Sequence, residues 1–287
     1  MNLNDTRIAI VGLGLMGGSL GLALKQYKVC REVVGLVRRD EAVTQAESLG
    51  VVDWATLDPA AALGQADLVI FSTPIRTLIK QLGELAEYCQ PNAIITDMGS
   101  TKQKVVQAMA KLPAGLQPLG SHPMCGKETA GMAAAEATLY NNAPWILTPL
   151  ARTDPVATQL VKKMAEAIGA KTQIIEATRH DNLVATISHL PYTLAATLTL
   201  TAGDVAKNDP AVWGVAAGGF RDTSRVAASD VTMMLDILLT NREAVVRRLA
   251  EAQTWLDKFA QAVSAGDEPT LRQMMESAAE QRRVLFQ

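Results

Sequence analysis

The stretch that decides the fold is IAIVGLGLMG, residues 8–17. Four apolar residues are followed by the pattern Gly-x-Gly-x-x-Gly, and helical spacing of apolar positions comes next. Gly12 suits the tight turn, Gly14 lets a pyrophosphate approach the backbone, and Gly17 lets the helix pack on the strand. The helix would then offer unpaired N–H groups to phosphates. The expected dinucleotide contacts in this stretch are Gly12, Leu13, Gly14, Leu15, Met16 and Gly17.

Outward from this turn, short apolar runs alternate with helical patterns up to about residue 177. The candidate strands are residues 8–11, 33–37, 68–72, 93–97, 117–120, 145–148 and 173–176. The candidate helices among them are residues 15–26, 40–49, 75–89, 101–112 and 155–168. Such alternation predicts an α/β domain of Rossmann type, residues 1–177, around a largely parallel sheet.

After residue 177 the strand pattern disappears, which predicts an all-α domain over residues 178–287. The candidate helices are residues 181–201, 210–217, 230–265 and 268–286. Residues 182–203 lack Asp, Glu, Lys and Arg, but five threonines, His189 and Pro191 favour a helix in a protein core over a membrane span. The region is too elongated and apolar to stand alone, so we expect a homodimer through the C-terminal helices.

Composition narrows the class of protein. The 287 residues are 48% hydrophobic and 20% charged, as in soluble globular proteins, and a net charge of -2 gives no general attraction to nucleic acid. Cys30, Cys89 and Cys125 form no CxxC pair, which disfavours disulfides and a zinc site and indicates a reducing, cytoplasmic compartment. The first residues do not have the pattern of a signal peptide.

The end of the second candidate strand bears on the choice of cofactor. An NAD site usually has Asp or Glu there, whereas this chain has Val37 followed by Arg38 and Arg39. Arginines can pair with a 2′-phosphate, so NADP is favoured over NAD. The alternatives are that the arginines are solvated loop charges, or that Asp40 serves NAD. Thr73-Pro74 ends another strand and is expected to contact the cofactor, or to be a plain turn.

Only three histidines are present. His122 directly follows an apolar strand and precedes a proline, which suits a general base at the carboxyl edge of the sheet, although a structural histidine fits equally. His180 begins a helix and is interpreted as structural. His189 is weighed below.

Six motifs in order resemble the prephenate and arogenate (cyclohexadienyl) dehydrogenase family. They are GLGLMGGSL at 12–20, Thr-Pro at 73–74, DMGSTK at 97–102, GSHPM at 120–124, SHLP at 188–191 and GFRDTSR at 219–225. The resemblance runs from about residue 7 to about residue 245. It implies oxidative decarboxylation of prephenate to 4-hydroxyphenylpyruvate with NAD(P)+ in tyrosine biosynthesis, or of arogenate to tyrosine.

The resemblance also implies roles for particular residues. His122 matches the catalytic histidine that takes the hydrogen of the substrate's C4 hydroxyl, and Ser100 matches a serine that orients the same hydroxyl. The expected substrate-binding residues are His189, Arg225, Arg221, Glu128 and Lys102. As alternatives, Ser100 caps a helix, His189 with Pro191 marks a buried kink, and Arg225 pairs with Asp222 or Asp230.

Cys125 and Lys127 depart from the family pattern close to His122. Two rival functions stay open at this point. A β-hydroxyacid dehydrogenase begins with a similar glycine turn but uses a lysine on its helical domain, and residues 182–203 contain none. A non-catalytic NADP-sensing protein is disfavoured because His122, Ser100 and Arg225 are all present.

Overall fold

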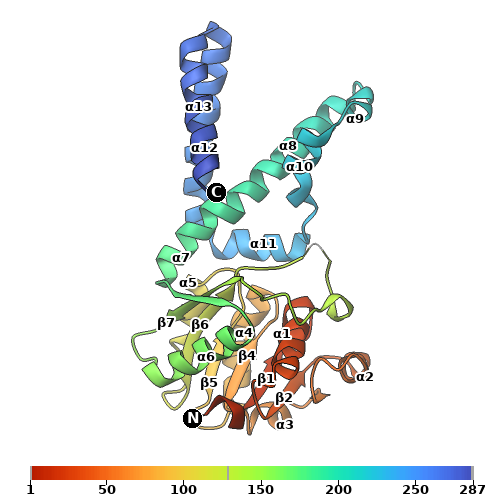
Figure 1. Cartoon of the computed structure of the whole chain (residues 1–287), viewed down its shortest axis with the longest axis vertical. Helices are drawn as coiled ribbons and strands as arrows, with labels where there is room; N and C mark the ends of the chain where they lie inside the picture. Colours follow the sequence, from red (N-terminus) through yellow and green to blue (C-terminus); the bar gives the residue numbers. More distant parts are fainter. Residues whose placement is uncertain (1, 128, 286–287) are drawn as a thin grey trace. The chain divides into compact units, whose positions relative to one another are not determined.

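The computed structural model describes residues 2–127 and 129–285, and the chain divides into two compact units, Met1–Asn241 and Arg242–Gln287 (Figure 1). Glu128 lies outside the described residues. Each unit is treated by itself below.

An eight-stranded sheet forms the base of the first unit. The strands are β1 Arg7–Val11, β2 Glu32–Leu36, β3 Trp54–Thr56, β4 Leu68–Phe71, β5 Ile94–Asp97, β6 Gln117–Pro123, β7 Pro144–Pro149 and β8 Lys171–Ile174. Their order is β3-β2-β1-β4-β5-β6-β7-β8, and β6 with β7 is the antiparallel pair among the described strands. The predicted α/β class and largely parallel sheet are confirmed. The sequence does not predict β3, because three residues are too few to show a period.

Helices cover both faces of this sheet. They are α1 Leu15–Gln26, α2 Asp40–Ser48, α3 Pro59–Leu63, α4 Ile75–Leu85, α5 Gln103–Met109 and α6 Pro155–Ala167. Short 3-10 turns lie at Leu3–Asp5, Ala86–Tyr88 and Met132–Ala134.

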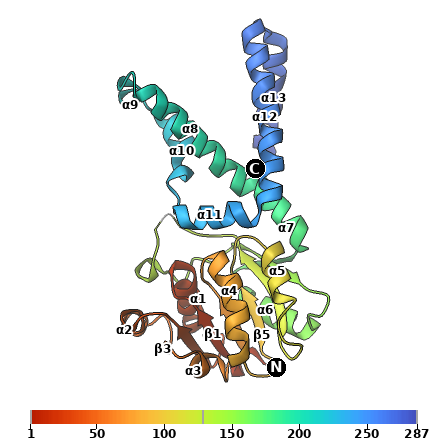
Figure 2. The ribbon, with the colours of Figure 1, turned by 180° about the vertical axis from the view of Figure 1, so that it is seen from behind.

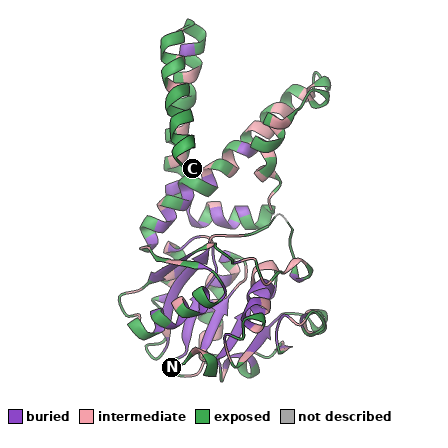
Figure 3. Ribbon diagram, in the orientation of Figure 1, coloured by how far each residue is buried: buried purple, intermediate pink, exposed green. Residues whose placement is uncertain are grey.

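The core has one layer on each face of the sheet. Ile8 and Ile10 of β1 belong to one apolar cluster, and Ala9 and Val11 belong to the other, because successive side chains of a strand point to opposite faces. Burial on both faces explains why the strands read as continuous apolar runs (Figure 3).

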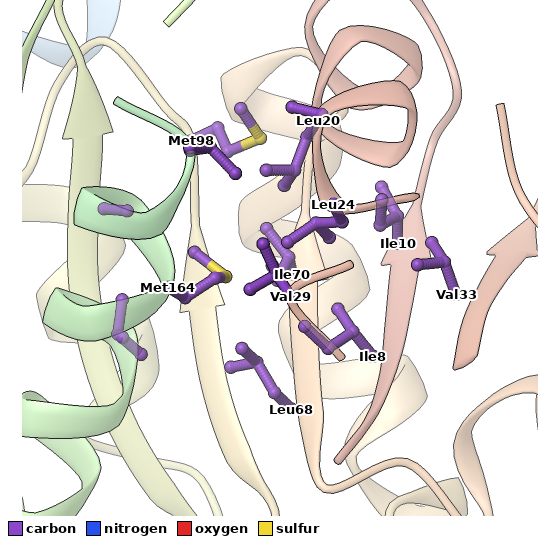
Figure 4. Close-up of a cluster of buried hydrophobic side chains, with 14 of the residues drawn as sticks. Ile8, Ile10, Leu20, Leu24, Val29, Val33, Leu68, Ile70, Met98 and Met164 are labelled. Carbon is purple, nitrogen blue, oxygen red and sulfur yellow. The ribbon is translucent and has the colours of Figure 1, made fainter. Parts of the chain in front are cut away.

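Each layer is closed by a different set of helices. Figure 4 shows the first cluster, in which Leu20 and Leu24 of α1 and Met164 of α6 pack on the strands. On the opposite face Leu78 of α4 and Val105 of α5 belong to the second cluster. Figure 2 shows α4 and α5 in front of the sheet. The carboxyl edge of the parallel strands is thereby held rigid, and that edge carries the site.

The first unit continues into a helical region. It contains α7 Ala177–Val184, a π-helical turn Ala185–His189, α8 Leu190–Ala206, α9 Ala211–Gly214, α10 Gly218–Ser224, the 3-10 turn η5 Arg225–Ala228 and α11 Val231–Thr240. α7 packs against α5, and α11 packs against α4. The domain boundary between residues 177 and 178, which stays a prediction, falls at the start of α7.

Two of the differences between the predicted and the observed helices affect the site. The helix expected at 181–201 starts at Ala177 and contains the π-helical turn. The helix expected at 230–265 is interrupted at Asn241, whose φ of -112° and ψ of 30° are not helical. Both irregularities bring side chains into the site described below.

The second unit is a pair of helices, α12 Arg242–Ala265 and α13 Glu268–Leu285. They are joined at Gly266, whose φ of +63° suits glycine at a helix end. The break between the helices expected at residues 230–265 and 268–286 is therefore present.

The run Ala177–Ala206 is long and apolar enough, by length and composition, to cross a membrane. Its polar residues His180, Asp181 and His189 are nevertheless at most 1% exposed, and they pair with other polar groups of the first unit. These contacts anchor the amino-terminal part of the run in the first unit, whereas most of the apolar run is not buried within the chain.

Candidate active site

The three glycines of the turn after β1 lie in different environments. Gly12 has a φ of +92°, and a Cβ on Gly17 would lie 2.1 Å from the carbonyl oxygen of Gly12. Both positions therefore require glycine for the turn itself. A Cβ on Gly14 would meet nothing within 4 Å, so this position faces open space at the amino end of α1. A dinucleotide's pyrophosphate fits that space.

The helices α1, α4 and α5 begin at this edge of the sheet next to one another, and the amino ends of α4 and α5 are already bound to carboxylates. Asp236 of α11 accepts the backbone N–H of Arg76 in α4 and pairs with its guanidinium. Asp181 of α7 accepts the N–H groups of Lys102 and Gln103 at the start of α5. Gly14, the N-cap of α1, offers no side chain, so among these three helices α1 is the one left for phosphates.

The arginines after β2 are placed where a ribose phosphate could meet them. Val37 directly follows β2 and is buried. Its N–H donates to the carbonyl oxygen of Thr56, the last residue of β3. Arg38 and Arg39 follow it, are exposed, and make no ion pair with any residue that the structure describes. Their charges are thus available to an anion.

Thr73 and Pro74 connect β4 to α4. A Cβ added to Gly12 would lie 2.6 Å from Cγ2 of Thr73, so the threonine methyl group lies directly beside the glycine turn. Thr73 Oγ1 donates to Oε1 of Gln81 over 2.6 Å, and Pro74 is the exposed N-cap of α4. The pair therefore borders the turn that would hold the cofactor.

The end of β6 carries a chain of polar groups. His122 Nδ1 lies 2.9 Å from Nε2 of His180, and Nδ1 of His180 lies 2.8 Å from Oδ1 of Asp181. His122 is 8% exposed, and its Nε2 has no hydrogen-bond partner among the described residues. A histidine held at one nitrogen and open at the other has the geometry of a general base.

Burial is the main influence on His122. Desolvation lowers the pKa of His122 well below 6.5, and the neighbouring His180, Lys102 and His189 lower it further. The imidazole is therefore neutral at neutral pH, as a base must be.

His189 lies at the end of the π-helical turn, and π-helical turns are often found at functional sites. The amide Nδ2 of Asn241 lies 2.7 Å from the carbonyl oxygen of Asp181 and 3.2 Å from Nδ1 of His189. Since a carbonyl can only accept, Nδ2 is the donor, and Nδ1 of His189 accepts. Burial lowers the pKa of His189 to about 4, so His189 is neutral and carries its hydrogen on Nε2.

Lys102 lies behind His122 and is fully buried. Its ammonium pairs with Asp97 and donates to the carbonyl of Ser121 over 2.6 Å. Asp97 also accepts the N–H groups of Gly99 and Ser121, so both of its carboxylate oxygens are hydrogen-bonded. The pair fixes the loop after β5 against β6.

The other predicted residues lie in separate places. Ser100 is half-buried in the loop before α5, and because this helix begins at Gln103, Ser100 is not its cap. Arg221 is exposed on α10 and pairs with its neighbour Asp222. Arg225 is exposed on η5, which packs against α8 and α10. Glu128 lies outside the described residues.

Sequence reasoning misses or misreads three residues of this cluster. The interpretation of His180 as structural overlooks its direct contact with His122. Asp181 receives no role from the sequence, where its position beside His180 at the start of a helix is the only hint. Asn241 carries no hint at all, because a single asparagine inside an apolar helical pattern does not predict a break.

Comparison with known proteins gives consistent matches along the chain. Residues 20–174 match the model of the prephenate dehydrogenase nucleotide-binding domain, and residues 176–277 match that of the prephenate dehydrogenase dimerization domain. A prephenate dehydrogenase of Bacillus subtilis (strain 168) is 36% identical over 98% of this chain and 76% of that protein.

Crystal structures of related proteins resemble nearly the whole chain, among them the following two. Prephenate dehydrogenase from A. aeolicus, in complex with hydroxyphenyl propionate and NAD+, has a TM-score of 0.91 at 28% identity, over 99% of this chain and 100% of that one. Arogenate dehydrogenase of Synechocystis has a TM-score of 0.84 at 30% identity, over 97% of this chain and 99% of that one.

Proposed function

The chain belongs to the prephenate dehydrogenase family, and we propose that it converts prephenate to 4-hydroxyphenylpyruvate by oxidative decarboxylation. It is a nicotinamide-dependent oxidoreductase of tyrosine biosynthesis. The observation that carries the proposal is the neutral, buried His122 with one ring nitrogen held by His180 and the other open.

In the reaction the substrate ring loses a hydride from C4, the proton of the C4 hydroxyl and the carboxylate of C1. When bound, the oxidised nicotinamide cofactor accepts the hydride. His122 Nε2 takes the hydroxyl proton, the C4–O bond becomes a carbonyl, and the C1–carboxylate bond breaks to release CO2. The electron pair of the broken C1–carboxylate bond enters the ring. The ring becomes a phenol when the carbonyl oxygen regains a proton. Removal of the C4 hydroxyl proton by a positioned base contributes roughly 100- to 10,000-fold to the rate.

The roles proposed for the remaining predicted residues follow the family resemblance. His189 donates through Nε2 to an oxygen of the substrate, and Ser100 orients the C4 hydroxyl. Arg225 binds a carboxylate as a bidentate donor, with Arg221 adding charge. Glu128, which lies outside the described residues, stays a predicted substrate-binding residue. We infer that Lys102 acts indirectly, since its ammonium is bound to Asp97.

A matrix of initial rates, with prephenate and arogenate each tested against NAD+ and NADP+, tests this function. We expect prephenate to be the faster substrate. Arogenate is the second candidate because the arogenate dehydrogenase of Synechocystis resembles the whole chain. No cofactor reduction with either compound, together with reduction by 3-hydroxyisobutyrate, would overturn the proposal and favour a β-hydroxyacid dehydrogenase.

The pH dependence follows from the neutral state of His122. Because its pKa lies well below 6.5, the base stays unprotonated as the pH falls through 6.5. We expect kcat/KM for prephenate to be constant from about pH 8 to 6.5 and to fall only at lower pH, where His122 gains a proton. Initial rates across this range check it, and an acid limb centred at 6.5 or above would contradict it.

The cofactor is proposed to be NADP, with NAD as the alternative. Arg38 and Arg39 are exposed at the end of β2 without an ion pair among the described residues. Each hydrogen bond to a charged group contributes about 1.5–3 kcal/mol, so replacing both arginines by Ala should lower kcat/KM for NADP+ by about 100-fold or more. The value for NAD+ should change little.

The matched control for this variant is Arg31→Ala, since Arg31 is also exposed but precedes β2 at the opposite end of the strand. It should leave both cofactors unaffected. Equal losses for NADP+ and NAD+ in the double variant would show that the arginines do not select the 2′-phosphate.

We propose a cytoplasmic homodimer as the working form, without nucleic-acid or membrane partners. The dimerization-domain match covers residues 176–277, and the α8 region exposes Ile187, Leu200 and Val205. Sedimentation at micromolar concentration should give a dimer, and Leu200→Glu should weaken it. Val156→Glu, an equally apolar and exposed position on α6, should not. A monomeric wild-type chain would contradict the proposal.

A further inference from the structure

We propose that His180 and Asp181 hold His122 in the tautomer with its hydrogen on Nδ1, so that Nε2 presents a lone pair to the substrate. This makes His180 a positioning residue for the base. The base role itself rests on the proposed function, whereas the tautomer can be tested without turnover.

The argument starts from Asp181. Its Oδ1 accepts the N–H of Lys102 over 2.7 Å, and its Oδ2 accepts the N–H of Gln103 over 2.9 Å. These bonds fix the carboxylate at the amino end of α5, where the helix dipole favours negative charge. The carboxylate can only accept hydrogen bonds, so the 2.8 Å contact requires His180 to donate from Nδ1.

The next two nitrogens follow by elimination. In the neutral form of His180 that we propose, one ring nitrogen donates and the other accepts, so with its hydrogen on Nδ1 the Nε2 of His180 accepts. The 2.9 Å contact with His122 therefore requires His122 to donate from Nδ1. What is left on His122 is Nε2 with its lone pair, the nitrogen without a partner among the described residues.

The same series of hydrogen bonds, from His122 through His180 to Asp181, stabilises the protonated base. When His122 takes a proton at Nε2, its Nδ1–H still donates to His180, whose Nδ1–H still donates to the anionic Asp181. The new charge is thus compensated by a carboxylate one imidazole away, in a site from which water is largely excluded. None of these hydrogen bonds needs to rearrange during the proton transfer.

A neighbouring contact gives His189 the opposite character. Asn241 donates to Nδ1 of His189 over 3.2 Å, which leaves Nε2–H as a donor. The two histidines therefore offer one acceptor and one donor. A hydroxyl that gives its proton to His122 could be polarised at its oxygen by His189.

Nitrogen NMR of the ¹⁵N-histidine-labelled full chain tests the tautomer directly, since the sequence contains only three histidines. Spectra of His122→Asn and His180→Gln assign the signals. We expect His122 to be neutral near pH 7.5 with hydrogen on Nδ1. A His122 with hydrogen on Nε2, or a doubly protonated His180, would overturn the proposal.

Two substitutions then connect the tautomer to rate. Gln at position 180 keeps an amide oxygen that can accept from His122, whereas Leu of similar size offers no acceptor. We expect His180→Gln to keep kcat within about tenfold and His180→Leu to lower it about 100-fold, which is within the range for a general base. The KM for the cofactor should change in neither variant.

Arg179→Gln is the matched control, because Arg179 is the exposed neighbour of His180 on α7. It should leave kcat and the His122 signal unchanged. Thermal unfolding of all three variants separates a positioning effect from loss of structure, and the Gln variant keeps the test decisive if the Leu variant does not fold. Wild-type kcat in a folded His180→Leu variant would overturn the proposal. An unexpected failure of the wild type to oxidise prephenate would instead refute the proposed function, and the NMR result would still decide the tautomer.

Discussion

Replacing His122 with Asn is expected to lower kcat for prephenate by about 100- to 10,000-fold, which corresponds to roughly 3–5 kcal/mol of transition-state stabilisation. Asn can still donate a hydrogen bond to His180, so the hydrogen bonds from position 122 to His180 and from His180 to Asp181 are kept. It lacks a ring nitrogen that can accept the hydroxyl proton. Steady-state initial rates with saturating cofactor give the measurement.

Two controls separate this effect from damage elsewhere. The dissociation constant of the cofactor and the midpoint of thermal unfolding should stay near the wild-type values, since the glycine turn is at a different strand. A folded, cofactor-binding His122→Asn variant with kcat within a factor of about three of wild type would show that another group removes the proton.

How much of this site is readable from the sequence depends on the range of the interactions. The turn at Gly12–Gly17 is predictable, with the roles of its glycines, because every contact involved is local or between adjacent elements. The place of His122 at the carboxyl end of an apolar strand is predictable as well, while its catalytic role stays a prediction. The cluster around it is not, because Asp181 reaches Lys102 across 79 residues of sequence. No periodic pattern encodes such a pairing.

Irregular backbone is the other limit. The π-helical turn ending at His189 and the helix break at Asn241 both lie inside continuous apolar patterns that predict regular helix. Tertiary hydrogen bonds override the local preference at both places, as is common at functional sites. For Lys102, the sequence suggests contact with cofactor or substrate, and only the burial of its ammonium against Asp97 indicates a supporting role.

Alanine substitutions at Gly14 and at Gly17 are expected to fail in different ways. In Gly14→Ala the added Cβ would meet nothing within 4 Å, and Gly14 has an ordinary φ of -86°, so folding stability should be unchanged. The same methyl group would occupy the space in which a pyrophosphate approaches the backbone. We expect the dissociation constant of the cofactor to rise at least about tenfold, or roughly 1.4 kcal/mol.

At Gly17 the added methyl group would lie 2.1 Å from a backbone oxygen, so the turn itself must shift. Such overpacking costs about 1–3 kcal/mol, which outweighs the roughly 1 kcal/mol that Ala gains over Gly within a helix. Gly17→Ala should therefore lower the free energy of unfolding as well as cofactor binding. Calorimetric titration and urea unfolding of both variants check the pair, and tight cofactor binding by Gly14→Ala would argue against the predicted phosphate position.

The most direct test of the whole account is the stoichiometry of the reaction with prephenate. Reduced cofactor, CO2 and 4-hydroxyphenylpyruvate should form in a 1:1:1 ratio, and the rates at which all three form should fall together by about 100- to 10,000-fold in the His122→Asn variant. Reduction of cofactor without release of CO2, or equal rates from wild type and variant, would contradict the account.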